Sequence, residues 1–285
     1  MSKVAVVRGR RGVEPVYWAL DLVDYGEALR GWDRVLVKVN FITTKNWETG
    51  ATTDPVVVEA IIDRMRDLKA EVYVVESDAT MTNADKAFIA SGMKEMCDRK
   101  GVPWINLRHA GDRVKIDVPG GAALKSVEVP HIVMNSAIVS AAKLKTHTET
   151  GVTLGMKNMF GLLPEKFKGR YHLRGIDKVI LDINTVLRPR LTVIDGFVAM
   201  EGRGPVGGRP VKMDLIIAGS DPVATDATAA RIMGFDPHLV NHISSAHDRG
   251  LGEIDGVEVL GERLEDVTRV FERLCPKPYF IMHWA

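Results

Sequence analysis

Valine-rich runs that alternate with segments of helical spacing are the feature of this chain that most restricts its fold. Lys3–Val7, Arg34–Val39 and Glu71–Val75 are rich in β-branched residues, which is typical of buried strands. Between them, residues 16–29 and the segment that begins at Pro55 carry apolar residues at helical spacing. Strands that alternate with helices form sheets covered by helices. The sequence therefore predicts an α/β fold with a largely parallel or mixed sheet and helices on both faces.

The rest of the chain continues the same pattern. Further strands are predicted near residues 104–107, 137–142, 191–194, 214–218 and 257–260, and further helices near 83–98, 151–163, 175–187, 222–233, 239–249 and 264–274. Two alternating segments, Arg113–Val118 and Leu124–Val129, read as a small β-hairpin insertion joined across Pro119–Gly121. We expect residues 1–285 to form a single α/β domain, or two lobes divided near residues 110–130.

The charge balance and the cysteine content exclude several classes of protein. Lys and Arg number 38 against 37 Asp and Glu, a net charge of +1, so no long-range field favours nucleic acid or an acidic membrane. No apolar run approaches the length of a transmembrane helix. Cys97 and Cys275 are the only cysteines, too few for a four-thiolate iron–sulfur cluster. Together with a charged N-terminal segment, this predicts a reducing, cytoplasmic location.

The densest polar cluster runs from Lys143 to Gly161, directly after the predicted strand at residues 137–142. Ligands of open α/β sheets bind beyond the carboxyl ends of strands, and a helix that starts near Thr150 would offer free N–H groups to an anion. The residues predicted to bind a phosphate or carboxylate here are Lys143, Lys145, Thr146, Thr150, Lys157 and Asn158. His147, Lys145 or both would handle protons. The alternative is that the lysines are surface charges and His147 is a packing residue.

A glycine-rich segment, Asp195–Gly208, provides a second candidate. We expect Gly202 and Gly204 to let the backbone approach a ligand closely. Asp195 and Glu201 flank the predicted loop and could bind Mg²⁺, orient a hydroxyl as catalytic groups or pair with the lysines. A wide loop of purely structural purpose is the alternative.

Two further segments carry polar residues next to predicted helices. Lys38 and Asn40 end a strand, and Thr52 and Thr53 precede the helix at Pro55, where their hydroxyls suit either an anion or a helix cap. Asp226 lies one turn into a helix of small and apolar residues where no local role explains it. We expect it to hold one of the lysines, or to join Asp195 and Glu201 at a Mg²⁺ ion.

Four ordered motifs resemble one known family. They are Lys38-Val-Asn40 with Gly50-Ala-Thr-Thr-Asp-Pro55, Lys143-Leu-Lys-Thr-His147 with Gly155-Met-Lys-Asn-Met-Phe-Gly161, the Asp195–Pro205 segment and Ser220-Asp-Pro-Val-Ala-Thr-Asp226. Over roughly residues 30–240 the chain resembles the family known as domain of unknown function 362. The resemblance implies a mainly archaeal and bacterial cytoplasmic protein that often carries a ferredoxin-like domain with two four-iron clusters. This chain departs from that pattern, because Cys275 is the only cysteine after residue 250.

The cationic cluster and the ferredoxin fusions of the family together suggest a redox cofactor. The leading hypothesis is a flavin or deazaflavin whose phosphate or acidic tail is held by Lys145 and Lys157, with electron or hydride transfer to a separate ferredoxin or another redox protein. One alternative is a Mg²⁺-assisted enzyme that acts on a phosphorylated or carboxylated metabolite, with Asp195, Glu201 and Asp226 as ligands. The other is a non-catalytic carrier or assembly factor for a small anionic ligand.

Overall fold

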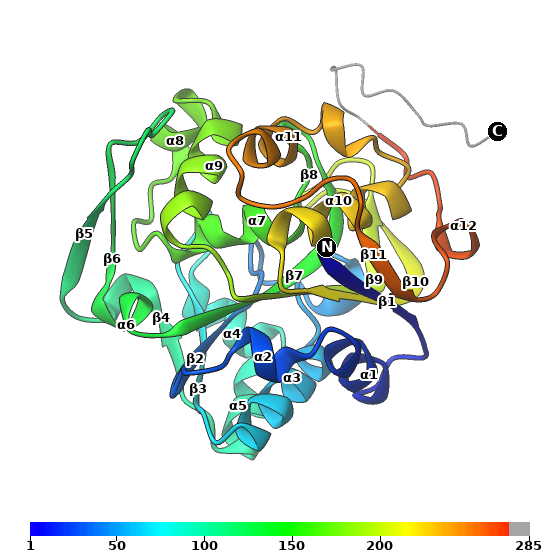
Figure 1. Ribbon diagram of the computed structural model, residues 1–285. Helices are drawn as coiled ribbons and strands as arrows, with labels where there is room; N and C mark the ends of the chain where they lie inside the picture. The colour runs from blue at the N-terminus through cyan, green and yellow to red at the C-terminus, as the bar shows by residue number, and fades with distance from the viewer. Residues whose placement is uncertain (274–285) are drawn as a thin grey trace.

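A computed structural model describes residues 1–273 and contains one large sheet (Figure 1). Within the described residues, eight strands follow the order β11-β1-β10-β9-β7-β2-β3-β4, and the short β8 pairs with β7 at the side. Strands β5 and β6 form a separate two-stranded hairpin. The predicted α/β class, the mixed, mostly parallel sheet and the hairpin insertion are confirmed. The possible division into two lobes near residues 110–130 stays a prediction.

The strands have the following bounds: β1 Lys3–Arg8, β2 Arg34–Lys38, β3 Glu71–Glu76, β4 Trp104–Asn106, β5 Arg113–Asp117, β6 Ser126–Pro130, β7 Ala137–His147, β8 Gly151–Val152, β9 Leu191–Glu201, β10 Arg209–Gly219 and β11 Glu258–Gly261. Strands β9, β7, β2, β3 and β4 are parallel to one another. Strand β10 runs against both β9 and β1. The carboxyl ends of β7, β2 and β3 therefore meet at one edge of the sheet.

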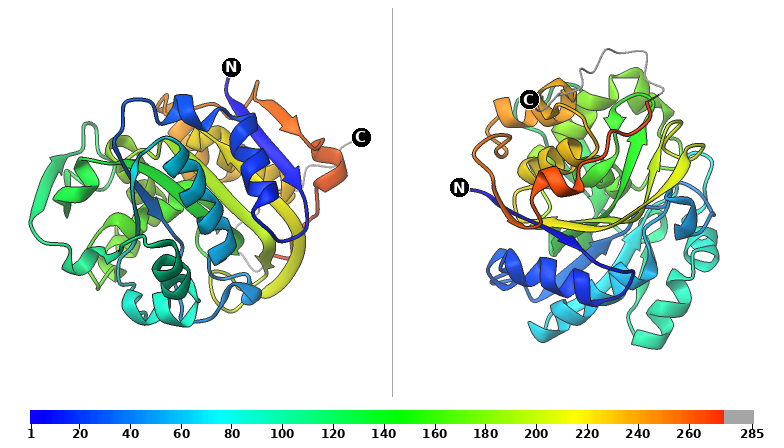
Figure 2. Two further views of the ribbon diagram at one scale, coloured as in Figure 1. Left: turned by 90° about the horizontal axis from the view of Figure 1, so that it is seen from below. Right: turned by 90° about the vertical axis from the view of Figure 1, so that its right-hand side faces the viewer.

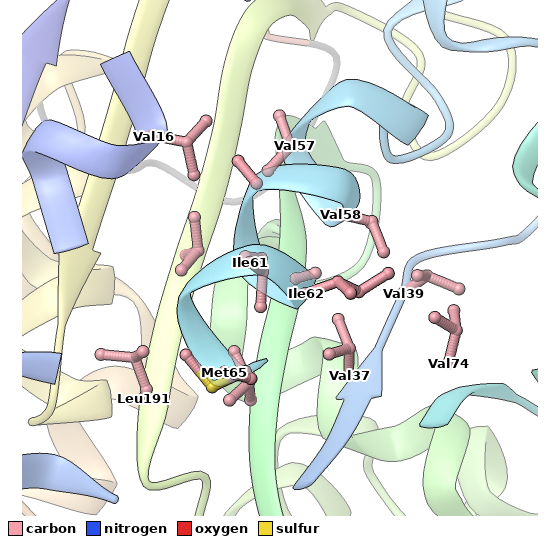
Figure 3. Packing of buried hydrophobic residues seen from close by; sticks show 14 of the residues in the cluster. Val16, Val37, Val39, Val57, Val58, Ile61, Ile62, Met65, Val74 and Leu191 are labelled. Atoms are coloured by element: carbon pink, nitrogen blue, oxygen red, sulfur yellow. The ribbon is translucent and has the colours of Figure 1, made fainter. Parts of the chain in front are cut away.

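Helices from the N-terminal part of the chain cover one face of the sheet (Figures 1 and 2). They are α1 Glu14–Leu22, α2 Tyr25–Ala28, α3 Pro55–Asp67, α4 Ala84–Ala90 and α5 Met93–Lys100. Figure 3 shows Ile61, Ile62 and Met65 of α3 packed among valines of β2 and β3. Asp54 caps α3 by accepting a hydrogen bond from the Val56 amide, and Pro55 fits the first turn because its missing N–H has no helical partner there.

Helices from the C-terminal part cover the opposite face (Figure 1). The main ones are α7 Leu154–Asn158, α8 Gly169–Leu173, α9 Ile176–Val186, α10 Pro222–Ile232 and α11 Asn241–Asp248. The short helical elements found along the chain are η1 Trp47–Thr49, η2 Leu107–His109, α6 His131–Met134, η3 Met159–Leu162, η4 Pro237–Leu239 and α12 Leu264–Val267. The hairpin is fastened to this layer by Asp182 of α9. Its carboxylate accepts the backbone N–H groups of Ala122, Ala123 and Leu124 at 2.7 to 2.8 Å.

The order of the connections creates a crevice between β2 and β7. The chain leaves β2 toward α3 on one face, whereas it leaves β7 toward α7 on the other (Figure 1). Neighbouring parallel strands whose connections diverge in this way leave an opening at their carboxyl ends, where ligands of α/β proteins bind. The strand order, which the sequence did not predict, therefore positions the candidate site.

Several predicted elements differ from the structure. Strands β1 and β2 run in the same direction but are not neighbours, because β10, β9 and β7 lie between them. The helix predicted at residues 83–98 is interrupted by Gly92, which has a φ of 77°. The predicted loop that begins at Asp195 is wrong in its first half, since β9 continues to Glu201. Of the helix predicted at 264–274, only α12 forms, and the last predicted residue lies outside the described range.

The helix predicted at residues 151–163 forms as α7 and η3, but its predicted start near Thr150 is wrong. Residues 151 and 152 form β8, which turns back along the end of β7, and α7 begins only after Thr153. No helix within residues 1–273 combines the length and the apolar character that a membrane crossing requires.

Candidate functional site

A cavity of about 350 Å³ opens at the carboxyl ends of β7, β2 and β3. That volume lies at the lower end of the range for small-molecule sites. The lining residues come from the three strand ends and the loops that follow them, from α7, η3 and α8, and from the loop between β9 and β10: Lys38, Asn40, Phe41, Ile42, Glu76, Ser77, Ala79, Thr80, Met81, Lys145, His147, Thr148, Glu149, Thr153, Lys157, Asn158, Phe160, Gly161, Lys168, His172, Pro205 and Val206.

A buried ion pair forms the floor of this cavity. Lys38 Nζ, at the end of β2, lies 2.9 Å from the carboxylate of Glu76, at the end of β3. The same amine donates to the Val39 carbonyl at 2.6 Å and to Asn158 Oδ1 at 3.1 Å. Asn158 in turn donates to the Lys38 carbonyl and to Ser140 Oγ. Each charge is therefore paired, as a buried ion pair requires, and Asn158 joins β2, β7 and α7.

Lys145 of β7 is buried beside the floor and has only neutral partners. Its Nζ donates to Asn40 Oδ1 at 2.7 Å and to the Ala51 carbonyl at 2.6 Å. Burial lowers the pKa of Lys145 well below its ordinary value, and the nearby charges of Lys157 and Lys143 lower it further. A neutral amine is the form that this environment favours.

Two more lysines extend toward the cavity from the helical layer. Burial lowers the pKa of Lys157 to about 8 and that of Lys168 to about 8. Lys168 donates to Ser77 Oγ at 2.6 Å. The ammonium groups of both lysines lie above the ring of Phe160, 5.9 and 5.5 Å from its centroid. Both remain mainly protonated at neutral pH and can attract an anion.

His147, at the end of β7, is held in one tautomer. Its Nδ1 accepts the backbone N–H groups of Glu149 and Thr150 at 3.2 and 3.3 Å, so the proton of a neutral ring must lie on Nε2. Burial lowers the pKa of His147 far below its ordinary value, with Lys157 and Lys145 adding to the effect. The imidazole is therefore a neutral hydrogen-bond donor at the cavity rather than a cation.

Thr153, just before α7, lines the cavity and carries an unused hydrogen-bonding group. Its Oγ1 is buried and has no hydrogen-bond partner among residues 1–273. Buried polar groups are nearly always satisfied. An unpaired hydroxyl in a residue that lines the same cavity as Lys157 and Lys168 therefore suggests that a ligand supplies the missing partner.

Another part of the lining is apolar. Phe41, Phe160, Met81, Pro205 and Val206 all contribute. Four lysines and two glutamates also line the cavity, which leaves a positive excess. A small molecule with an anionic end and an apolar or aromatic end would complement these two parts.

The predicted anion-binding residues divide into two groups. Lys38, Asn40, Lys145, His147, Lys157 and Asn158 come together around the cavity. Lys143 does not line it, because its buried Nζ pairs with Asp195 of the neighbouring strand at 2.7 Å. Asp195 also accepts the Asp54 backbone N–H, and Arg11 binds Asp54 with both Nε and Nη2. Burial raises the pKa of Asp195, an effect that Lys143 opposes.

The predicted threonines lie outside the lining. Thr52 donates to the Lys45 carbonyl, and Thr53 donates to the Ala141 carbonyl while it accepts the Asn40 N–H. Thr146 faces the other side of β7 and donates to the Gly202 carbonyl at 3.1 Å. Thr150 donates to the Val152 carbonyl within its own turn. These hydroxyls hold the backbone of the strand ends in position.

The glycines of the 202–208 loop serve packing rather than the cavity. A Cβ at Gly204 would lie 1.8 Å from the Thr146 carbonyl oxygen, so only glycine permits the loop to approach β7. Gly202, with a φ of 82°, donates its N–H to the Glu272 carbonyl. Pro205 and Val206 are the residues of this loop that reach the cavity.

The three carboxylates predicted to bind Mg²⁺ are not gathered in one place. Asp195 and Glu201 are six positions apart on β9, about 20 Å along an extended strand. Glu201, which was also predicted as a catalytic group, pairs with Arg209 at 2.6 Å and with Arg269 at 3.3 Å. Although burial opposes it, the Arg209 hydrogen bond keeps the pKa of Glu201 below its ordinary value. Within residues 1–273, no cluster of three or more His, Cys, Asp or Glu side chains suits a metal ion.

Asp226 of α10 caps a helix instead of holding a lysine. Its two carboxylate oxygens accept the N–H groups of Gly155 and Met156, each at 2.8 Å. These amides belong to the first turn of α7, so they are not free for a ligand. Burial raises the pKa of Asp226 to about 7.

The sequence did not lead us to predict Glu76, Ser77, Lys168 or the apolar residues of the cavity lining. Glu76 does end a valine-rich strand parallel to β2, and a carboxylate at that position is a usable signal for a partner of Lys38. Lys168 has no comparable signal. It lies in a connecting segment after η3, and only the tertiary structure carries it to Ser77, 91 positions earlier in the chain.

Comparison with known proteins identifies the family. The model of the family described as "Domain of unknown function (DUF362)" matches residues 35–231, and the chain belongs to this family. Every residue of the cavity lining falls within the matched range. Thylakoid-associated protein sll1697 of Synechocystis sp. (strain ATCC 27184 / PCC 6803 / Kazusa) is 25% identical over 233 residues, which cover 79% of this chain and 71% of the relative. No solved structure matches significantly.

Proposed function

We propose that this member of the DUF362 family binds a small organic anion, with a phosphate or carboxylate at one end, in the cavity between β7, β2 and β3. The observation that carries the proposal is that Lys157 and Lys168, which have no carboxylate within 4.0 Å among residues 1–273, line one cavity together with Thr153, whose hydroxyl has no hydrogen-bond partner there. A hydroxyl and two ammonium groups form the donor set that a phosphate or carboxylate accepts.

The specific ligand that we propose is a flavin or a deazaflavin. Its acidic tail would accept hydrogen bonds from Lys157, Lys168 and Thr153, and its ring would contact Phe160 and Phe41. The chemistry of the lining suits such a group, because a cation, Lys157 of α7, lies next to an aromatic ring, Phe160 of η3. When bound, the cofactor would supply electron or hydride transfer to a separate redox protein, while His147 would donate a hydrogen bond through Nε2. We further propose a cytoplasmic location.

The two alternatives, a Mg²⁺-assisted enzyme and a non-catalytic carrier, differ in how well the site residues support them. No specific observation favours a Mg²⁺-assisted enzyme, because its three proposed carboxylates have other partners. A non-catalytic carrier of a small anion would use the same cavity. Stoichiometric binding without electron transfer would indicate that role.

The decisive experiment is calorimetric titration of the purified chain with FMN, a deazaflavin phosphate and inorganic phosphate. Lys157→Ala and Lys168→Ala should each weaken binding about tenfold or more, because one charge-assisted hydrogen bond to a phosphate contributes about 1.5–3 kcal/mol. Lys145→Ala should abolish binding if its amine contacts the ligand. Absorbance of the bound flavin during reduction would report electron transfer.

The matched control is Lys115→Ala, since Lys115 is exposed on β5 outside the cavity lining. This variant should bind as the unmodified protein does. Failure of every tested anion to bind a folded protein would contradict the proposal, and so would binding that the cavity variants leave unchanged.

A further inference from the structure

Lys145 differs from the other strand lysines of this region in its partners. Its Nζ donates to two neutral oxygens, Asn40 Oδ1 and the Ala51 carbonyl, and among residues 1–273 no carboxylate lies within 4.0 Å of it. Lys38 and Lys143 are equally buried, but each is paired with an acid, at 2.9 and 2.7 Å. Of these three strand lysines, Lys145 alone lacks an acidic partner within residues 1–273.

The hydrogen bonds of Lys145 suit a neutral amine. A neutral amine has two N–H bonds and one lone pair, whereas an ammonium group has three N–H bonds and no lone pair. The two acceptors account for both N–H bonds and leave the lone pair free. Burial and the neighbouring cations of Lys157 and Lys143 lower the pKa of Lys145, which favours the same form and is the usual way in which proteins produce nucleophilic lysines.

We propose that Lys145 forms an imine with a small carbonyl compound, an aldehyde or keto acid whose carboxylate or phosphate is held by Lys157 and Lys168. This inference rests on the anion-binding part of the proposed function and not on its redox part. A carbonyl compound and a flavin would be competing occupants of one cavity.

The step conserves atoms and electrons without an oxidant or a reductant. The Lys145 lone pair attacks the carbonyl carbon, a C–N bond forms, and the carbonyl oxygen takes up a proton to give a carbinolamine. The C–O bond then breaks and the oxygen leaves as water, which carries away both original amine protons after their relay through neighbouring groups, so that a C=N bond remains. Lys157, with a pKa lowered to about 8, can relay the proton. His147 Nε2–H can hydrogen-bond the oxygen while the bond changes occur.

Reductive trapping tests the proposal. The protein is incubated with glyoxylate, a carboxylate-bearing aldehyde, and cyanoborohydride, and then analysed by intact mass and peptide mapping. We expect one reduced adduct at Lys145 and none at Lys143, which lies two positions away on the same strand. Lys157→Ala should slow labelling about tenfold, since it removes one anion contact worth about 1.4 kcal/mol. Propionaldehyde, which has no anionic group, should label Lys145 more slowly.

Lys145→Arg keeps a long hydrogen-bonding side chain but cannot form an imine, and it should abolish the adduct, whereas Lys115→Arg should retain it. Peptide mapping of the unmodified protein locates the adduct directly, so the test does not depend on whether the Lys145→Arg variant folds. An adduct at another lysine, or no adduct in a protein that phosphate still stabilises thermally, would overturn the imine while leaving the anion site intact. No adduct and no anion binding would overturn both proposals.

Discussion

At the scale of single residues, glycines and hydrogen-bonding side chains determine how closely the elements of the site approach. Gly155 and Gly161 both belong to the motif shared with the family. A Cβ at Gly155 would lie 2.4 Å from Thr192 Cγ2, and one at Gly161 would lie 2.4 Å from Lys38 Nζ and Glu76 Oε1. Neither position allows a larger side chain without movement of its neighbours. The two glycines therefore set the distance between the helical layer and the strand ends.

Gly161→Ala should disturb the floor of the cavity. The new methyl group would push apart the Lys38–Glu76 pair, and overpacking of this kind typically lowers the free energy of unfolding by about 1–3 kcal/mol. Anion affinity should fall as well. Gly169→Ala is the control, because nothing lies within 4 Å of its Cβ position and alanine is favoured in helices. Chemical denaturation of both variants measures the effect, and equal stability would contradict it.

At the scale of elements, β7 shows how one strand separates structural from functional charges. Lys143, Lys145 and His147 alternate along β7 and so project to the same face. Lys143 meets Asp195 across the pairing with β9, whereas Lys145 lies past a shift of register and reaches Asn40 and Ala51 instead. Because of this shift of register, Lys143 forms an ion pair with the neighbouring strand, whereas Lys145 lines the cavity.

Lys143→Met should therefore cost much more stability than Lys145→Met. Removal of Lys143 leaves Asp195 as a buried charge without a cation, which typically costs about 3–5 kcal/mol. Removal of Lys145 leaves two neutral acceptors unpaired, at about 1–3 kcal/mol. Urea denaturation compares the two. A larger loss in Lys145→Met would mean that Lys145 is the structural lysine, against the assignment made above.

At the scale of the whole molecule, a nearly neutral chain encloses a locally cationic cavity. The net charge of the chain is only +1. Several of its acids, such as Asp195, Glu201 and Asp226, are buried and bind other groups of the protein away from the cavity. Lys157 and Lys168 at the cavity therefore have no carboxylate within 4.0 Å among residues 1–273. A ligand there would join β2, β3, β7 and α7, and should stabilise the whole fold.

The buried Asp226 should make global stability depend on pH. Its pKa is raised to about 7, whereas an unfolded aspartate has a pKa of about 3.9. The folded state therefore binds the extra proton between these values, and this contribution is complete below about pH 4 and lost as the pH rises through 7. Relative to Asp226→Asn, the unmodified protein should lose up to about 1.4 kcal/mol of unfolding free energy per pH unit in that window. Denaturation at pH 5 and pH 7.5 measures the difference.

A difference between the two proteins that stays constant with pH would show that Asp226 is ionised throughout. A difference that changes in the opposite direction would show that the amides of Gly155 and Met156 lower its pKa more than burial raises it.

The sequence by itself determined the fold class, most strands, the hairpin and the family, because these depend on local patterns. Valine-rich strands and apolar residues at helical spacing can each be recognised within a few consecutive residues, because they depend on the local backbone periodicity and on which side chains are buried. The same local information selected six residues that line the cavity, since they follow strand ends or lie in a dense basic motif. They are Lys38, Asn40, Lys145, His147, Lys157 and Asn158.

Only the tertiary structure decided which charges are free to act. Lys143 and Lys145 are alike in sequence, yet one is paired with Asp195 and the other is not. Asp226 caps α7 and Glu201 binds arginines, so neither joins a metal site. Lys168 reaches the cavity from a segment without any motif. The reason is physical: a side chain's charge state and availability depend on its burial and its partners. The partners of Lys143, Asp226, Lys168 and Lys38 lie 52 to 120 positions away in the chain.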